Sequence, residues 1–590
     1  MAADSASQRY SSAYAIFEGG GVKALAHVGA LKALEEVKLA LVGVAGTSAG
    51  AIIAALVAVG YEPDEIFLSS NDNILSRLNL SGPIELLGQD KWNRFQSWKV
   101  RSLFILLVNL SGLAVLLFKG VIAGYVTLII PGFGPLLSAS LINAVAIALL
   151  VISIVWAVRE VWPLIRDRGL FKSDIIRDTV NLALKRKLEE YKAQGLIDDD
   201  IPDVVLFEHI DPARIPRCIP LKVVATNVTD GELTLFDHRT KHIPVGDAVA
   251  ASAALPFVFC PTKVRGFTTS DAEFADGGLV SNMPSWVFRD EKRARERLET
   301  RDGGRDRVPI YAFELHEKQV ASAARHSRLG AIWPYIRKVL TAGIFGGQTI
   351  IQKFVPDLRV IQLEATLATM AFDCSGSDAE EAVAAGRASA ADFLGRERLT
   401  EDLTNRVLTA IHEKVCAAIT ENRGREAPRI RIALIDPVTS SSESDVVGFR
   451  VVAGANMNDD SDDALELDVN GSIAPAAFKE NRAIFGEIGT RTPAELLMTK
   501  YERALLPQGL HSVIALPIYA LPTETQRPRR VLAVDSSDDL RSEFESKPFM
   551  DTLVGASASA SRKLIQDAVG AIMAREFAGE PHAQADLPID

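Results

Sequence analysis

The sequence predicts an α/β fold built on a parallel sheet, followed by a smaller α+β domain. Two short apolar runs, residues 14–17 and 41–45, each lead through a glycine-containing turn into a segment with apolar residues at helical spacing. A strand, a glycine turn and a helix, repeated twice near the start of a chain, are typical of a parallel sheet with helices packed on it. Strand-like runs separated by acidic, serine-rich loops beyond residue 429 indicate the second domain.

The remaining elements follow from the same patterns along the chain. Apolar residues at helical spacing predict helices at 22–37, 51–59, 173–191 and 549–577, with closing helices and a connector over 372–422. Short apolar or β-branched runs predict further strands at 221–226, 233–236, 273–275, 309–314, 430–435, 446–453, 512–518 and 531–535. We therefore expect a first domain over 12–396, a helical connector over 397–428 and a C-terminal domain over 429–578.

The composition disfavours several classes of protein. Of 590 residues, 48% are hydrophobic and 24% are charged, a balance typical of folded globular domains. The net charge of −11 disfavours a nucleic-acid-binding role, which usually needs a basic surface. Four widely spaced cysteines argue against a disulfide framework or a zinc ribbon and fit a reducing compartment. The N-terminus has no basic segment followed by an apolar core, so we expect no secretory signal.

Ser48 is the candidate nucleophile, at the centre of the sequence Gly46-Thr47-Ser48-Ala49-Gly50. A nucleophilic serine on a sharp turn between a strand and a helix needs small neighbours, because the backbone packs tightly around an exposed hydroxyl. The N-terminus of the following helix favours negative charge that develops there. The pattern alone is weak, but the strand before it and the helix after it strengthen the prediction. The alternative is a turn that only caps a helix.

Gly19, Gly20 and Gly21 follow the first strand and precede the first helix, so their amides are candidates for binding an anion. A dinucleotide-binding fingerprint needs a glycine where the chain has Ala24, and a phosphate loop needs a Gly-Lys-Ser/Thr sequence that this segment lacks. The interpretation that remains is an oxyanion hole for a tetrahedral intermediate formed at Ser48. The alternative is a tight turn without a ligand.

Asp276 is the candidate general base, because it ends a strand-like run and is followed by two glycines. None of the nine histidines has neighbours that mark it as a base, and His27 is interpreted as a packing or hydrogen-bonding residue. A Ser–Asp pair, in which the carboxylate accepts the serine proton, is therefore considered. The alternative is a simple turn aspartate.

These three segments together resemble the patatin-like phospholipase family. The matching residues lie at 17–29, 46–50 and 276–278, with further matches at 169–171, 248–261, 372–373 and 386. The resemblance covers about residues 14–394 and implies a three-layer α/β/α sandwich that hydrolyses lipid acyl esters with a Ser–Asp dyad. Carried over by position, it implies Ser48 as the nucleophile, Asp276 as the general base, and Gly19, Gly20 and Gly21 as the oxyanion hole.

The sequence departs from the family's pattern at two positions beside the glycine triplet. Lys23 stands where the family usually has arginine, and Ala24 stands where it usually has glycine. Neither change removes an amide donor from the triplet, so the departures concern only the fine positioning of the loop.

Residues 102–158 form an apolar block that contains a single charged residue, Lys119. Two apolar arms, 103–130 and 136–158, flank a Pro-Gly-Phe-Gly-Pro turn, and the second arm is long enough as a helix to cross a bilayer. Basic residues at both outer ends predict that both ends are cytoplasmic, and tryptophans at these borders resemble interfacial anchors. We expect an inserted membrane hairpin. The alternative is an apolar lid buried against the catalytic core or a dimer partner.

Residues 429–578 resemble a GAF domain, through strand patterns at 449–453, 471–474, 512–518 and 531–536. This resemblance rests on strand pattern and few fixed residues, so it names no ligand-binding residue. It implies either a sensor of small molecules or a dimerisation domain that binds no ligand.

The leading hypothesis is a membrane-associated serine lipid acyl hydrolase, similar to phospholipase A or lysophospholipase enzymes and regulated by its C-terminal domain. The hypothesis places it at the cytoplasmic face of a membrane, which would be the inner membrane in a bacterium, and requires no cofactor and no metal. Lipid and membrane are the predicted partners, without nucleic acid, and a small-molecule ligand of the C-terminal domain and a homodimer are further candidates. The alternatives are a non-catalytic membrane lipid sensor and a lipid acyltransferase.

Overall fold

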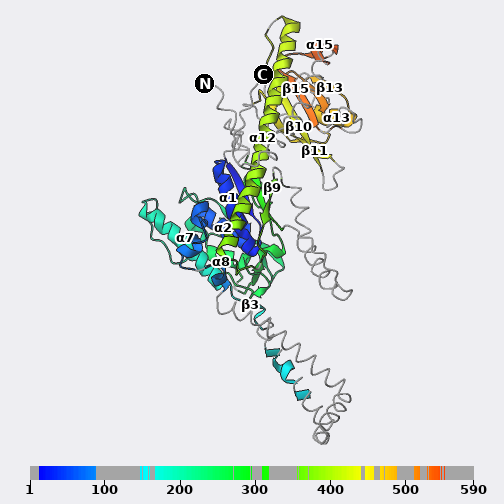
Figure 1. The fold of residues 1–590 in the computed structure, drawn as a ribbon. Helices are drawn as coiled ribbons and strands as arrows, with labels where there is room; N and C mark the ends of the chain where they lie inside the picture. Colours follow the sequence, from blue (N-terminus) through cyan, green and yellow to red (C-terminus); the bar gives the residue numbers. More distant parts are fainter. Residues whose placement is uncertain are drawn as a thin grey trace. The chain divides into compact units, whose positions relative to one another are not determined.

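The computed structural model describes about three fifths of the chain. The described residues are 12–80, 82–87, 147–148, 151–156, 158–159, 166–269, 271–292, 294, 308–317, 355, 358–369, 371–424, 426–439, 446–457, 466–470, 472–487, 510–518, 528, 530–544, 546–547 and 551. They fall into two compact units (Figure 1). The first lies within Tyr10–Arg289 and Val308–Ala391, and the second consists mainly of residues within Asp392–Asp590.

The first unit is built on one mixed sheet with a parallel centre. Its strands are β1 (Ser12–Phe17), β2 (Ala40–Thr47), β4 (Leu221–Asn227), β5 (Glu232–Phe236), β7 (Phe274–Asp276), β8 (Ile310–Glu317) and β9 (Leu358–Ala365). They follow the order β5-β4-β2-β1-β8-β9, and β7 also pairs with β4. β4, β2, β1, β8 and β9 run parallel, whereas β5 and β7 are antiparallel to β4. The predicted α/β fold with a parallel-sheet core is therefore confirmed, and the three-layer arrangement remains a prediction.

Helices connect the strands of this sheet and pack on it. The longer ones are α1 (Leu25–Glu36), α2 (Ala49–Ala58), α7 (Asp174–Ala193) and α8 (Val245–Ser252). Short turns of helix are η1 (Gly21–Ala24), α3 (Pro63–Ile66), α4 (Ile74–Arg77), η2 (Pro83–Leu87), η3 (Phe207–Ile210) and η4 (Gly277–Leu279). β3 (Gly169–Phe171) and β6 (Phe257–Phe259) form a separate two-stranded parallel pair.

Helix α2 is the most central of these helices. Its sequence is apolar on nearly every side, which is the pattern of a buried helix. It packs on β1, β2 and β4 and against α7 and α8. The residue that precedes α2 is therefore held in the middle of the first unit, at the end of β2.

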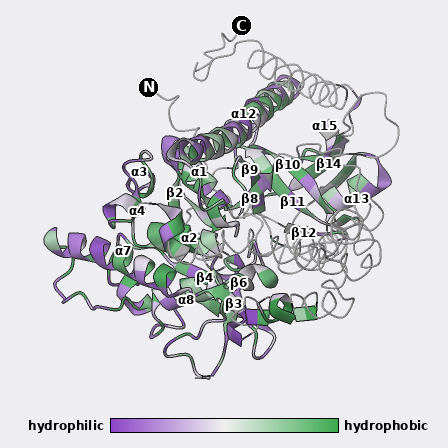
Figure 2. Cartoon of the chain, turned by 60° about the horizontal axis from the view of Figure 1, so that its bottom comes forward, coloured by the Kyte–Doolittle hydropathy of each residue, from purple (hydrophilic) through white to green (hydrophobic). Residues whose placement is uncertain are grey.

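Helix α12 (Gly376–Arg423) is a single helix of 48 residues. The sequence instead suggested closing helices followed by a connector, with a domain boundary at residue 396. That boundary falls inside α12, whose earlier residues belong to the first unit and whose later residues belong to the second. Hydrophobic and hydrophilic residues alternate along it (Figure 2), and Gly386 lies where a Cβ atom would meet the backbone of Ala26 in α1 at 2.1 Å.

The second unit is an antiparallel sheet with apolar residues on both faces. Its strands are β10 (Ile430–Thr439), β11 (Val446–Ala455), β12 (Glu466–Asp468), β13 (Ile484–Glu487), β14 (Ser512–Ile518) and β15 (Arg530–Ser536), in the order β12-β11-β10-β15-β14-β13. Ile432 and Leu434 of β10 pack in one cluster with α12, while Ala433 and Ile435 pack in another with α13 (Ile473–Glu480). This alternation follows from the two-residue period of a strand. A short helix, α15 (Arg541–Phe544), follows β15.

The strands predicted at 430–435, 446–453, 512–518 and 531–535 lie within β10, β11, β14 and β15. The resemblance to a GAF domain is not shown by this arrangement. The predicted last helix, 549–577, falls outside the described residues except for residue 551.

The membrane hairpin predicted at 102–158 also lies outside the described residues, apart from 147–148, 151–156 and 158. In the part of the chain that the structure describes, no helix combines the length and the hydrophobicity that a membrane crossing needs. The large apolar side chains at 151, 152, 154, 155 and 158 are exposed.

Candidate active site

Ser48 occupies a sharp turn between β2 and α2. Its φ and ψ angles are 54° and −128°, a region that non-glycine residues rarely adopt. The two flanking glycines make the turn possible, because a Cβ atom at Gly46 would lie 2.2 Å from the carbonyl oxygen of Gly50. A Cβ atom at Gly50 would lie 2.3 Å from the carbonyl oxygen of Phe17. Strained backbone of this kind is common where a side chain must be presented to a substrate.

The fold brings Ser48 and Asp276 into direct contact. The Ser48 Oγ donates a hydrogen bond of 2.6 Å to Oδ2 of Asp276, although 228 residues separate them in the sequence. Asp276 ends β7, which pairs with β4 so that Asp276 lies opposite Ala225. The amide of Gly278 donates to the other carboxylate oxygen at 2.7 Å. Each oxygen of the carboxylate therefore has a partner, and the side chain is held in one orientation.

Burial makes Asp276 a stronger base than an ordinary aspartate. The residue is 3% exposed, and desolvation raises its pKa to about 6, while the hydrogen bonds from Ser48 and Gly278 act in the opposite direction. The carboxyl group is therefore mostly ionised at neutral pH, yet it holds a proton more readily than a solvent-exposed aspartate does. A pKa close to the working pH is what general base catalysis favours.

Ser252 is a further residue of this site. The amide of Ser48 donates a hydrogen bond of 2.9 Å to Oγ of Ser252, whose hydroxyl donates in turn to the carbonyl oxygen of Val224 at 2.6 Å. These bonds tie the turn at Ser48 to α8 and to β4. The sequence analysis included Ser252 only within the resemblance at 248–261 and gave it no role, because nothing in the local sequence indicates a partner 204 residues away.

The three glycines line the same cavity as Ser48, and a Cβ atom at Gly19 would lie 2.9 Å from the Cβ atom of Ser48. Their amides differ in their hydrogen bonds. The Gly19 amide donates to the carbonyl oxygen of Asn282 at 3.2 Å. Within the described part of the chain, the amides of Gly20 and Gly21 have no hydrogen-bond acceptor. Gly21 has a φ of +57°, and a Cβ atom there would lie 2.2 Å from the carbonyl oxygen of Thr369, so the position requires glycine. Gly20 and Gly21 are the amides available to an anion, whereas Gly19 would first have to exchange its bond to Asn282.

A buried carboxyl group, Glu18, holds the start of the glycine loop. Its two oxygens accept hydrogen bonds from the Asn282 side-chain amide at 2.7 Å and from the Leu315 amide at 2.6 Å. The Asn282 amide also lies 3.2 Å from the carbonyl oxygen of Gly19. Burial is the largest cause that raises the pKa of Glu18, to about 7. Sequence reasoning missed Glu18 and Asn282, because their roles depend on the approach of β1, β8 and the segment after Asp276.

His27 contacts the backbone at the start of this loop and takes no part in the contact between Ser48 and Asp276. Its Nε2 lies 2.9 Å from the carbonyl oxygen of Glu18, and the ring packs edge-on against Phe17 and Phe313. Full burial lowers the pKa of His27 to about 4. Among the histidines in the described ranges, none forms a hydrogen bond with Ser48 or Asp276. The interpretation of His27 as a packing and hydrogen-bonding residue is consistent with these contacts.

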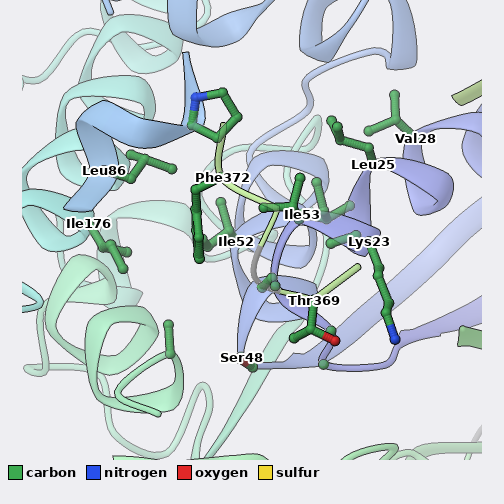
Figure 3. Close-up of a pocket in the computed structure, with 18 of the residues that line it drawn as sticks. Lys23, Leu25, Val28, Ser48, Ile52, Ile53, Leu86, Ile176, Thr369 and Phe372 are labelled. Carbon is green, nitrogen blue, oxygen red and sulfur yellow. The ribbon is translucent and has the colours of Figure 1, made fainter. Parts of the chain in front are cut away.

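A cavity of about 740 Å³ opens from Ser48 into the first unit. Ser48, Asp276 and the three glycines lie in its wall, and most of the other lining side chains are apolar. Ile52, Ile53 and Leu56 of α2 line it, together with Leu25 and Phe372. Figure 3 shows Ser48 at one end of this group of side chains, with Ile52, Ile53 and Phe372 beyond it. The cavity suits an apolar group that is attached to a polar, reactive end at Ser48.

No cluster of three or more histidine, cysteine, aspartate or glutamate side chains suited to a metal ion occurs among the residues that the structure describes. The carboxylates closest to the site, Asp276 and Glu18, already accept hydrogen bonds at both oxygens.

Comparisons with known proteins match part of the chain to one family. Residues 15–289, slightly less than half of the chain, match the family model of patatin-like phospholipases. The chain is also 23% identical over 331 residues to the uncharacterized protein YqhO of Bacillus subtilis, covering 53% of this chain and 81% of that protein. Residues 15–289 therefore form a patatin-like phospholipase domain.

Two solved structures show a weak similarity to the chain. They are VipD from Legionella pneumophila, with 16% identity, 65% of this chain covered and a TM-score of 0.30, and ExoU in complex with SpcU from the type III secretion system of Pseudomonas aeruginosa, with 14% identity, 71% covered and a TM-score of 0.28. This chain covers 66% of each of those chains, just under two thirds of their length. Similarities this low carry no information about activity.

Proposed function

We propose that this protein is a serine-dependent lipid acyl hydrolase of the phospholipase type, with Ser48 and Asp276 as its catalytic dyad. The observation that carries the proposal is the 2.6 Å hydrogen bond from Ser48 to Asp276 in the wall of an apolar cavity. The match of residues 15–289 to patatin-like phospholipases supports the same reaction class.

The first step is transfer of the substrate's acyl group to Ser48. Oδ2 of Asp276 accepts the hydroxyl proton while Oγ of Ser48 forms a bond to the ester carbonyl carbon. Negative charge moves to the carbonyl oxygen, where the amides of Gly20 and Gly21 and the N-terminus of α2 stabilise it. The intermediate then expels the alcohol, which takes the proton from Asp276, and the acyl group remains on Ser48.

The second step is hydrolysis of the acyl-enzyme. Asp276, again ionised, accepts a proton from a water molecule as the water oxygen attacks the acyl carbonyl carbon. The second tetrahedral intermediate uses the same amides and releases the fatty acid, and Oγ of Ser48 recovers its proton from Asp276. Loss of a single oxyanion donor typically costs a factor of about 100 to 1,000 in rate, so the glycine loop contributes a large part of the acceleration.

The apolar lining of the cavity supports binding of the acyl chain, rather than the head group, in the interior of the domain. Ile52, Ile53 and Leu56 recur on one side of α2 as it leads away from Ser48. An acyl chain that lies along this face removes its methylene groups from water, at about 0.8 kcal/mol each. The preference for phospholipid or lysophospholipid is then decided at the open end, where the alcohol part of the ester remains.

The site of action is proposed to be the cytoplasmic face of a membrane. The apolar block at 102–158, with basic residues at both ends, supports this location through its sequence pattern. Regulation by the C-terminal unit is part of the same proposal and rests on the presence of a separate folded unit after the catalytic one.

Labelling with a fluorescent fluorophosphonate tests the dyad. In detergent, the full-length protein should be labelled, and Ser48→Ala and Asp276→Asn should each abolish labelling, because one removes the nucleophile and the other its base. Asp178→Asn, which changes an exposed carboxylate of α7 paired with Arg177, is the matched control and should label like the wild type.

Two results would contradict the assignment. Labelling of Ser48→Ala at the wild-type level would show that another serine reacts, and full labelling of Asp276→Asn would show that the carboxylate is not the base. Release of free fatty acid from phospholipid vesicles, compared with transfer of the acyl group to added glycerol, then separates a hydrolase from an acyltransferase.

A further inference from the structure

We propose that Leu170, Leu255 and Val280 form an apolar rim at the mouth of the cavity, and that this rim docks on the surface of a lipid bilayer. The inference rests on the proposed lipid hydrolase function and adds to it the surface through which the substrate enters. It uses only residues within the described part of the first unit.

The three side chains are exposed although they are large and apolar. Their exposed fractions are 40% for Leu170, 37% for Leu255 and 44% for Val280. Single exposed apolar residues are common on soluble proteins, but a group of them around a binding cavity indicates an interaction surface.

Backbone hydrogen bonds hold both Leu255 and Val280 close to the candidate base. The amide of Asp276 donates to the carbonyl oxygen of Ala254 at 2.8 Å, which places Leu255 next to Asp276. The amide of Val280 donates to the carbonyl oxygen of Gly277 at 3.1 Å, in the turn that directly follows Asp276. Leu255 also lines the cavity, so it belongs both to the interior wall and to the exposed surface. Leu255 therefore connects the rim to the cavity.

Leu170 joins the rim through the small strand pair. β3 pairs with β6 in parallel, with Gly169 opposite Phe257 and Phe171 opposite Phe259. This register sets Leu170 beside Val258, which lines the cavity. Gly169 and Phe171 are buried while Leu170 between them is exposed, as the alternation of a strand requires.

A lipid surface fits this rim better than a protein partner does. Leu255 belongs both to the rim and to the cavity wall, so a protein partner seated on the rim would compete with an acyl chain that enters the cavity. β3 is also bordered by exposed basic side chains, Arg166 and Arg168 before it and Lys172 after it. Arg168 contacts Glu273 at 2.6 Å and Arg166 contacts Asp167 at 2.9 Å. All three basic side chains are exposed, and surface ion pairs of this kind are weak enough to exchange for anionic head groups. Apolar side chains flanked by lysine and arginine are typical of surfaces that insert shallowly into bilayers.

The test compares one variant on two substrates. Leu170→Gln combined with Val280→Asn makes the rim polar without adding charge near Asp276 and without altering a residue that lines the cavity. On vesicles of phosphatidylcholine and phosphatidylglycerol in equal amounts, we expect kcat/KM to fall about tenfold or more. On a water-soluble short-chain ester in the absence of vesicles, we expect kcat/KM to be unchanged, because the dyad and the cavity remain intact.

The matched control is Leu182→Gln combined with Leu196→Gln. These leucines are exposed to a similar extent, at 49% and 45%. Leu182 lies within α7, and Leu196 follows the C-terminal end of α7. α7 has 20 residues, about 30 Å at 1.5 Å per residue, so it carries Leu196 away from β3. The control should keep wild-type rates on both substrates.

Equal vesicle rates for the rim variant and the wild type would overturn the inference. A change in oligomeric state of the rim variant, seen by size-exclusion chromatography with light scattering, would also overturn it, because it would assign the rim to a second copy of the chain. If the wild type hydrolyses neither substrate, the proposed function itself fails, and this outcome is distinct from a loss confined to vesicles.

Discussion

The carboxyl group of Asp276 combines burial with two hydrogen bonds, and the balance of these effects decides its chemistry. Desolvation alone favours the neutral form, whereas the Ser48 hydroxyl and the Gly278 amide both favour the anion. Because desolvation is the larger effect, the pKa rises to about 6. The residue is thus basic enough to accept the serine proton but still ionised at neutral pH.

Hydrolysis of a soluble ester should fall on the acid side of about pH 6, by roughly tenfold for each further pH unit, because a protonated Asp276 cannot accept a proton. Titration of Asp276 does not itself destabilise the folded state over this range. A carboxyl whose pKa is raised by folding contributes stability below its unfolded pKa and loses it as pH rises through the folded pKa. A pH–rate profile of kcat/KM, with circular dichroism at each pH, measures both effects.

Glu18 provides the control for this profile, because its pKa is also raised by burial, to about 7. In Glu18→Gln the acid limb near pH 6 should persist, since Asp276 is unchanged. Disappearance of that limb in Glu18→Gln would mean that Glu18, and not Asp276, is the group whose ionisation controls the rate.

At the scale of elements, the site depends on how closely β2, α2 and β1 approach one another. Gly46 lies in the buried part of β2, and Gly50 belongs to the first turn of α2. Each occupies a place where a Cβ atom would meet backbone, at 2.2 Å and 2.3 Å. Backbone cannot move aside as a flexible side chain can, so both positions exclude every residue larger than glycine.

Gly46→Ala should lower the free energy of unfolding by about 3 kcal/mol, because the added methyl group overlaps the Gly50 carbonyl oxygen. Urea denaturation followed by circular dichroism measures the change. Gly82→Ala is the matched control, since no atom lies within 4 Å of a Cβ atom at that position, and its unfolding free energy should stay within about 0.5 kcal/mol of the wild type. Equal stability of the two variants would contradict the proposed close packing.

At the scale of the whole molecule, α12 is shared by two units with separate cores. Ala382 and Ala390 are buried within the first unit, whereas Leu408, Val415 and Ile419 pack with the sheet of the second. The last part of the helix is therefore amphipathic, and its apolar stripe packs on the sheet of the second unit. Without that sheet, the stripe would face water.

Two truncated chains should behave differently for this reason. In the same detergent, a chain that ends after residue 396 should remain monodisperse and hydrolyse a soluble ester, because it keeps the whole first unit. A chain that ends after residue 424 should self-associate through the exposed stripe of Leu408, Ile411, Val415 and Ile419. Light scattering of both chains measures the difference, and a monodisperse longer chain would contradict the prediction.

Local sequence alone was sufficient to predict the elements that are marked by turn residues or by a regular apolar period. The turn at Ser48 is marked by two glycines with a strand before and a helix after, and β14 coincides with the run predicted at 512–518. Turn chemistry and the two-residue period of a strand act between near neighbours, so a single sequence reveals them. β9, β12 and β13 were missed, and β3 and β6 were not predicted as strands. Apart from β9, these strands have only three or four residues, which is too few to show a two-residue period.

The sequence by itself determined the parallel α/β core and the sharp turn at Ser48, and it predicted Asp276 as a candidate base, because glycine conformation and apolar periodicity are local properties. Only the tertiary structure decided the contact of Ser48 with Asp276, the anchoring of the Ser48 amide by Ser252 and the loop held by Glu18 and Asn282. It also decided that Gly19 already donates to Asn282, while Gly20 and Gly21 remain available to an anion. These contacts join residues more than 200 positions apart through the register of β7 on β4 and the approach of β1 to β8. Burial follows from the same long-range packing, so the raised pKa values of Asp276 and Glu18 could not be derived from neighbouring residues in the chain.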